Sequence, residues 1–144
     1  MPDFDVRLDD HGTTVFIQGL ADRSRDLRPA HMMVGEIMYA STMENFEEEH
    51  DPWGNPWMPN SPFTLREKRR LGRIMKVLQS TGIMKSRTNY KVARDSVTIG
   101  NYDNKARKHH EGIDTPQRVF LGVSDEDLAE ISAAYADYVS EGAT

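Results

Sequence analysis

Two segments of the chain alternate apolar and polar residues with a period of two. The first spans residues 3–18 and the second residues 87–100, and in each a polar break separates two apolar runs. Successive side chains of a β-strand point to opposite faces, so this period indicates strands with one buried face. We therefore predict two antiparallel hairpins whose apolar faces are covered by the rest of the chain.

A helical period replaces the alternation over about residues 26–49. At about 100° per residue, the apolar residues of this segment fall into two separate stripes. One stripe contains Leu27, Ala30, Val34, Ile37 and Met38, and the opposite stripe contains Met32, Tyr39, Met43 and Phe46. A helix with two apolar faces either lies between other elements of its own domain or packs its second face on another molecule. The pattern favours neither, so the second stripe is a candidate subunit interface.

Prolines and both tryptophans of the chain are concentrated in a loop predicted over residues 50–63. Proline fixes φ and removes a backbone donor, so no regular helix or strand fits this composition. We interpret Trp53 and Trp57 as anchors that hold the loop on the body of the fold. A platform on which a ligand stacks is the less favoured alternative, because no polar groups converge near them in the sequence.

Residues 64–79 follow a helical period and predict a helix with one apolar and one basic face. The apolar face contains Leu71, Ile74, Met75 and Leu78, and we expect it to pack on the core. The other face carries Arg66, Lys68, Arg69, Arg70, Arg73 and Lys76, against the single acid Glu67.

The rest of the sequence predicts a basic helical turn over residues 104–110, a short strand over residues 118–122 and a final helix over residues 124–139. Ser124 is a suitable N-cap for that helix, and the acids that follow it suit the helix dipole. Together these elements predict a single α+β domain. Its antiparallel sheet has about four to five strands and is packed by the long helix and the C-terminal helix.

Composition narrows the class of protein. The 144 residues carry a formal net charge of -5, which argues against the whole chain acting as a nucleic-acid binder. Cysteine is absent, which excludes disulfides and thiolate chemistry. No apolar run approaches the ~20 residues of a membrane helix and no signal-peptide pattern occurs, so we expect a soluble protein made in a cytoplasm, with no membrane partner.

His109, His110 and Glu111 suggest a metal site, but adjacent side chains point apart. A zinc-binding helix places two histidines at i and i+4 so that both rings converge. The other histidines are scattered, and no nucleophile elbow, P-loop or dinucleotide-binding motif occurs. We therefore predict that the protein is not an enzyme, with no catalytic residues, no metal and no cofactor.

Charge is distributed unevenly along the chain. The segments 36–51 and 119–144 each hold six acids and no lysine or arginine. The basic face over residues 66–76 has three interpretations: a solvated surface, the phosphate-binding surface of a monomeric DNA- or partner-binding module, or a surface that meets the acidic segments of another copy. A head-to-tail contact of the last kind produces a ring when its rotation closes.

Several short patterns resemble the virion-morphogenesis, or tail-completion, family of tailed bacteriophages. In chain order they are DPWGNPWMPNSPFTL after the long helix, LQSTGIMKSR before a hairpin that closes with VTIG, then HHEG, and finally PQRVFLGVSDEDLAEI. The resemblance covers about residues 46–131. The family usually has tyrosine and alanine together before a histidine, a variable residue and glycine. Here Tyr102 and Ala106 are spaced apart, and His109 or His110 takes the histidine place.

The resemblance implies a small structural virion protein that acts in head–tail joining, at the neck or at the top of the tail. In that role, copies assembled in the host cytoplasm form a homo-oligomeric ring around the DNA channel. Head-completion or adaptor proteins and tail proteins are its neighbours, and packaged DNA passes through the lumen. The family implies no catalytic residues. The residues that we expect at the subunit interface are Met32, Tyr39, Met43, Phe46, Arg66, Arg69, Arg70, Arg73 and Arg118.

Overall fold

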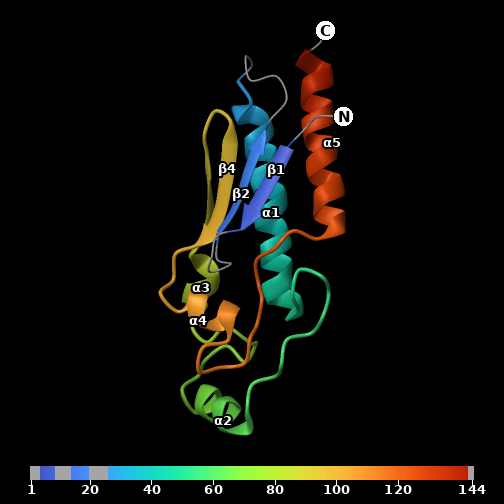
Figure 1. Ribbon diagram of the computed structural model, residues 1–144. Helices are drawn as coiled ribbons and strands as arrows, with labels where there is room; N and C mark the ends of the chain where they lie inside the picture. The colour runs from blue at the N-terminus through green and yellow to red at the C-terminus, as the bar shows by residue number, and fades with distance from the viewer. Residues whose placement is uncertain (1–3, 9–13, 20–25, 143–144) are drawn as a thin grey trace.

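The computed structural model describes residues 4–8, 14–19 and 26–142 (Figure 1). The turn expected near residues 10–12 and most of the connector expected over residues 19–25 lie outside these ranges.

Four strands form one antiparallel sheet in the order β1-β2-β4-β3. The strands are β1 (Phe4–Leu8), β2 (Thr14–Gly19), β3 (Thr88–Val92) and β4 (Ser96–Asn101). β1 pairs with β2 and β3 pairs with β4, so both predicted hairpins are confirmed. The two hairpins join through the antiparallel pair of β2 and β4.

One face of this sheet is buried because the alternation stays in register across the central strands. Val15 lies opposite Ile99 and Ile17 lies opposite Val97, and all four side chains are fully buried. Cross-strand pairs of β-branched residues are the contacts that stabilise a sheet face. The buried face is therefore set by the period of two in the sequence.

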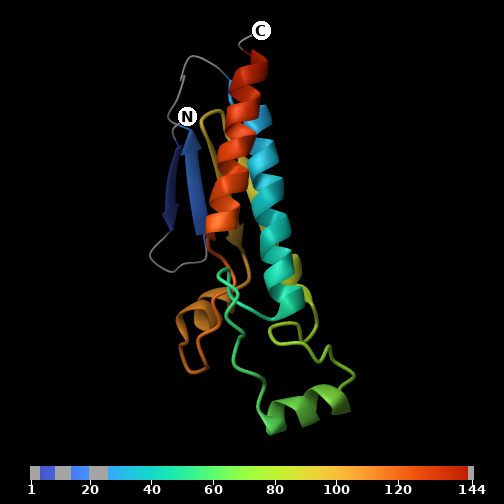
Figure 2. The same ribbon diagram turned by 90° about the vertical axis from the view of Figure 1, so that its right-hand side faces the viewer.

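Two long helices lie side by side against the sheet (Figures 1 and 2). α1 (Arg28–Glu48) packs against β3 and β4, and α5 (Asp125–Gly142) packs beside α1. The Tyr135 ring of α5 lies 5.5 Å from the Phe4 ring of β1, which places α5 over the other hairpin. The fold is thus α+β, with the long helix and the C-terminal helix packing the sheet as predicted.

The buried face of α1 is a single broad one, which corrects the prediction of two stripes. It includes residues that are polar or lack a side chain, namely His31, Gly35, Thr42 and Asn45. Thr42 Oγ1 donates to Met38 O at 2.8 Å, and Asn45 Nδ2 donates to Phe120 O at 3.0 Å. Because these groups are paired, burying them costs little, and a pattern of apolar residues alone does not reveal them.

The members of the second stripe differ in how deeply they are buried. Phe46 is fully buried, and its ring lies 5.4 Å from the Phe120 ring, so its assignment to a subunit interface is wrong. Met43 is half-buried and packs against the core. Tyr39 is also half-buried, whereas Met32 is 56% exposed.

Residues 118–122 form no strand, which corrects the predicted one. Side chains form hydrogen bonds with carbonyl groups that would otherwise pair with a neighbouring strand. Trp57 Nε1 donates to Val119 O at 2.7 Å, and His110 Nε2 lies 3.1 Å from Leu121 O. The segment is therefore fixed by long side chains from distant elements and needs no ladder partner.

Gly35 lies where α1 meets the ring of Tyr90, and a side chain does not fit there. A Cβ on Gly35 would lie 2.9 Å from Cγ of Tyr90 and closer still to two other ring carbons. We expect Gly35→Ala to destabilise the protein by about 1–3 kcal/mol, although alanine is the better helix former. Urea unfolding measures this. In a Tyr90→Ala background the same change is expected to be neutral or stabilising, and stabilisation in the native background would contradict the packing.

His31 of α1 gives the fold a predicted pH dependence. It is fully buried, its Nδ1 lies 2.8 Å from Tyr135 Oη, and no group of the described chain pairs with its Nε2. Burial lowers the pKa of His31, and the nearby Asp95 and Asp26 only partly oppose this. The neutral form is thus favoured in the folded state, so stability is full above about pH 6.5 and falls as the pH drops towards the folded pKa.

The slope of that loss is at most about 1.4 kcal/mol per pH unit for one histidine. We expect His31→Gln to be less stable than the native chain at pH 7.5 and to lose less stability between pH 7.5 and 5.5. Chemical unfolding at both pH values measures the difference. An equal pH dependence in the two proteins would show that His31 does not titrate on unfolding.

Candidate interaction surface

Three short helices lie beyond one end of the sheet, where the chain leaves the two-layer body (Figures 1 and 2). They are α2 (Pro62–Arg70), α3 (Ile83–Ser86) and α4 (Ala106–Glu111). α4 confirms the short basic helix predicted there. We call residues 58–86, which include α2 and α3, the α2 lobe.

α2 begins near the predicted place and ends early. Ser61 is its N-cap, since Ser61 Oγ accepts a hydrogen bond from Thr64 N at 3.2 Å. The helix ends at Arg70 because Gly72 adopts a left-handed conformation with a φ of +67°. The prediction of one helix over residues 64–79 is therefore wrong, and so is a continuous basic helical face over the same stretch.

The loop after α2 is held against the C-terminal end of α1. Gln79 Nε2 donates to Phe46 O at 2.9 Å, and Lys76 Nζ donates to Glu47 O at 2.7 Å. Carbonyls at the end of a helix lack partners within the helix, so these side chains cap α1. The loop is thereby positioned with Val77 and Leu78 packed on the core, while its other large apolar residues stay exposed.

Large apolar side chains of the α2 lobe are exposed, contrary to the prediction that they face the core. Leu71, Ile74 and Met75 are 52, 42 and 39% exposed, and Phe63 at the start of α2 is 66% exposed. Only Leu78 of the predicted apolar face packs against the core. Clustered exposed apolar groups of this kind mark surfaces that a partner covers.

Arg118 holds the segment that leads into α2 through two hydrogen bonds. Its Nε donates to Met58 O at 2.9 Å and its Nη2 donates to Pro59 O at 3.2 Å, and the residue is only 6% exposed. Trp57, the residue before Met58, is also buried, and its Nε1 donates to Val119 O. The interpretation of Trp57 as an anchor is confirmed. Arg118 holds the loop of its own chain, and another copy can contact it only through the cavity that it lines.

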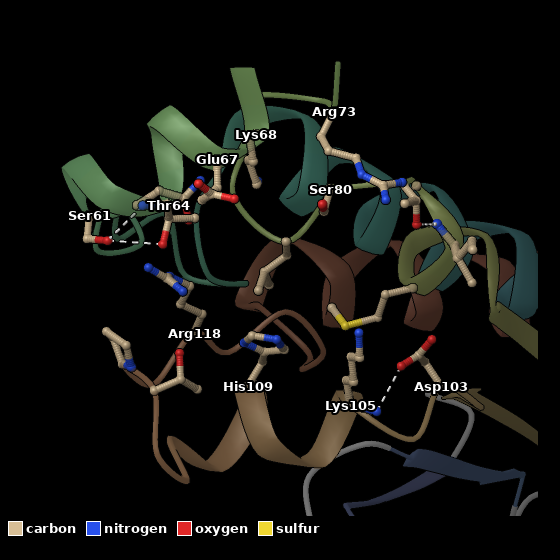
Figure 3. A pocket seen from close by; sticks show the side chains of 18 of the residues that line it. Ser61, Thr64, Glu67, Lys68, Arg73, Ser80, Asp103, Lys105, His109 and Arg118 are labelled. Atoms are coloured by element: carbon tan, nitrogen blue, oxygen red, sulfur yellow. Dashed lines mark hydrogen bonds between the residues drawn. The ribbon is translucent and has the colours of Figure 1, made fainter. Parts of the chain in front are cut away.

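A cavity of about 800 Å³ lies between α2, the loop after it and α4. In Figure 3, Lys68 and Glu67 line it from the α2 side, and Arg118, His109 and Lys105 line it from the opposite side. Its apolar lining comprises Met58, Pro59, Phe63, Leu71, Leu78, Ile83, Met84 and Pro116. We call this the α2 cavity. Its volume is typical of pockets that enclose a bound group, roughly 300–1,000 Å³.

The deep part of the α2 cavity is positively charged. Burial lowers the pKa of Lys68, and the Arg118 guanidinium lowers it further, while Glu49 acts in the opposite direction. Burial also lowers the pKa of His109, again assisted by Arg118, and no group of the described chain pairs with His109 Nδ1. Lys68 Nζ and Arg118 donate to backbone carbonyls, and neither forms an ion pair with a described residue. The arrangement favours a partner that brings negative charge or an electron-rich ring.

The four arginines expected at the interface lie on the outside of the α2 lobe. Arg66, Arg69, Arg70 and Arg73 are exposed. Arg70 pairs with Glu67 at 2.8 Å on the surface, and Arg73 lines the mouth of the α2 cavity. Their interface role remains a prediction, and their positions are compatible with it.

His109, His110 and Glu111 do not come together as a metal site in the structure. His109 faces the α2 cavity (Figure 3), whereas His110 Nε2 lies 3.1 Å from Leu121 O. The adjacent histidines therefore diverge. Within residues 4–8, 14–19 and 26–142, no three His, Cys, Asp or Glu side chains gather closely enough to hold a metal ion. None of the described helices is both long and apolar enough to cross a bilayer.

Sequence analysis did not identify the α2 cavity or the buried cation Lys68, which is only 7% exposed. One signal was present: Gly72 follows a run of helix formers and marks the helix end that opens the cavity. The approach of α4 to α2 depends on contacts between distant segments, and no local pattern encodes it.

A comparison with models of protein families matches residues 8–140 to the phage virion morphogenesis family. Searches of curated proteins and of solved structures find no match. The family match begins at the last residue of β1 and includes β2, α1, the α2 lobe, the β3–β4 hairpin and most of α5, so it spans the surface described above as well as the core. With almost the whole length matched, the chain belongs to the phage virion morphogenesis family, and its role is in the assembly of a bacteriophage particle.

Proposed function

We propose that this chain completes the joint between the head and the tail of the particle, as one subunit of a homo-oligomeric ring around the DNA channel. It acts as a structural protein of the neck or tail, and its ring contacts head-completion or adaptor proteins on one side and tail proteins on the other. Family membership supports a role in virion assembly, and the shape and surface of the chain support the ring.

The observation that carries the proposal is the α2 lobe. It extends from the two-layer body (Figure 2). It exposes Phe63, Leu71 and Met75 close in sequence to several exposed arginines. In an isolated small domain, exposed apolar and cationic groups on an extension would add nothing to the stability of the fold. Interfaces between proteins, by contrast, are enriched in aromatic residues, methionine and arginine.

The distribution of charge also supports contacts between copies. Basic residues are concentrated on the α2 lobe, while exposed acids lie on α1 and at the start of α5, including Glu44, Glu126 and Glu130. Two different surfaces of one chain that complement each other produce a heterologous contact, and such a contact forms a ring when its rotation closes.

The test uses heads and tails from the parent phage with this gene deleted. Adding the purified chain is expected to restore joined, infectious particles, counted by electron microscopy and by plaque formation. A Phe63→Ser, Leu71→Ser variant is expected to fold, because both residues are exposed, and to restore at least about tenfold fewer particles. Met33→Ser, a similarly exposed position on α1, serves as the matched control.

Failure of the native chain to increase the number of joined particles would contradict the proposed place in assembly. Equal restoration by the native chain and by the Phe63, Leu71 variant would contradict the role of the α2 lobe. Circular dichroism of each variant confirms that the comparison is between folded proteins.

A further inference from the structure

The two tryptophans of the proline-rich loop differ in environment. Trp57 is 6% exposed and acts as the predicted anchor, whereas Trp53 is 58% exposed and only one edge of its ring lies against Gly122. A rigid turn presents Trp53, since Asp51 Oδ1 accepts hydrogen bonds from the backbone N–H groups of Trp53 and Asn55, both at 2.9 Å. A large aromatic side chain held on a fixed turn loses little entropy when a partner covers it.

Trp53 shares a surface groove with several acidic side chains. It lines a surface groove of about 880 Å³ between α1 and the start of α5, together with Glu36, Glu44, Asp125, Glu126 and Glu130. Lysine and arginine are absent from the described lining of this groove. Acids in the first turn of α5 also suit the helix dipole, but this does not account for Glu44 on α1 or for the exposure of the indole.

The α2 cavity complements this turn in shape and in charge. It is a concave, largely apolar space with Lys68 and Arg118 at its base and the exposed Arg73 and Lys105 at its mouth. A cation beside the face of an indole is stabilising, and the effect is larger away from water. Acids around an inserted ring would meet Arg73 and Lys105 at the rim, where complementary charges set the register of a contact.

We propose that Trp53 of one copy inserts into the α2 cavity of the next copy and is the central anchor of the ring contact. Trp53 is not among the residues that line the α2 cavity of its own chain, so the contact joins two different surfaces and is heterologous. This inference rests on the proposed function, and it names the two parts of the chain that meet.

Two variants test the proposal, each altering one side of the contact at exposed residues. Trp53→Ala removes the anchor, and Arg73→Glu with Lys105→Glu reverses the charge at the mouth of the cavity. Tyr102→Ala is the control for the first, because Tyr102 is 56% exposed on another surface. Lys108→Glu is the control for the second, because Lys108 is exposed on α4 and does not line the cavity.

Sedimentation velocity measures self-association of each purified protein, and binding to particles that lack the chain is measured alongside. Each variant of the contact is expected to associate at least about 30-fold more weakly than the native chain, whereas both controls associate normally. A mixture of the two contact variants is the decisive sample. Trp53→Ala keeps an intact cavity and the charge-reversed variant keeps Trp53, so the mixture is expected to form heterodimers and nothing larger.

The outcomes separate this proposal from the proposed function. If the native chain self-associates and Trp53→Ala associates equally well, the Trp53 contact is overturned and the ring is left in place. A mixture of the two contact variants that forms no heterodimers would have the same meaning. Absence of native self-association, both alone and on particles, would overturn the ring and the Trp53 contact together.

Discussion

Replacing Phe46 with alanine is expected to destabilise the monomer by about 3–5 kcal/mol, the usual cost of removing a buried phenylalanine. Phe46 is fully buried, and its ring lies 5.9 Å from the Trp57 ring and 5.4 Å from the Phe120 ring. Its removal leaves a cavity where α1, the proline-rich loop and the segment before α5 meet. Urea or thermal unfolding of the purified chain measures the loss.

Met32→Ala is the control for this prediction, because Met32 lies on the same helix, was placed in the same stripe and is 56% exposed. It is expected to change stability by less than about 0.5 kcal/mol. A Phe46→Ala variant that keeps full stability while losing assembly would contradict the buried position and restore Phe46 to the interface.

Replacing Arg118 with methionine is expected to destabilise the chain by about 2–3 kcal/mol and to raise the pKa of His109. The guanidinium donates to Met58 O and Pro59 O, and hydrogen bonds to a charged group are worth about 1.5–3 kcal/mol. Arg118 is also the largest charge effect lowering the pKa of His109, so its removal leaves burial as the main cause.

Unfolding in urea measures the change in stability, and a proton NMR titration of the histidine ring measures the pKa. Arg107→Met is the matched control, because Arg107 forms an ion pair with Glu111 at the surface and such pairs contribute about 0–1 kcal/mol. A His109 pKa that stays the same in Arg118→Met would mean that the two groups do not share the α2 cavity.

The parts of the fold that the sequence predicts are those governed by local period. Alternation in residues 87–100 set both the strands and the buried face of the second hairpin, because a one-residue slip would expose Val97 and Ile99. The extent of α1 followed from its helical period in the same way. The start of α5 followed from Ser124, whose Oγ accepts a hydrogen bond from Asp127 N at 3.0 Å.

Three of the errors have a common physical cause, which is pairing between distant polar groups. Asn45 belongs to neither apolar stripe, yet it is buried, and the Phe120 carbonyl accepts its hydrogen bond. Residues 118–122 look like a strand but donors such as Trp57 satisfy their carbonyls. Arg118 was expected at an interface from the family resemblance, whereas carbonyls of a loop remote in sequence accept its hydrogen bonds and bury most of it.

The surface that we propose for assembly could be predicted only in part. The basic character of the α2 lobe was evident from Arg66 to Arg73, since charge can be counted in a sequence. The α2 cavity could not be predicted, because it exists only where α4 approaches α2. The exposure of Trp53 was also hidden, since the sequence around it gives the two tryptophans of the loop similar settings.

The most direct test of the account is a cryo-electron microscopy reconstruction of the head–tail joint in completed particles of the parent phage. The account predicts a ring of copies of this chain at the joint, with the α2 lobe of each copy against its neighbour. A completed particle without the chain would show that it acts only during assembly. That result, or single copies with the α2 lobe facing solvent, would contradict the account.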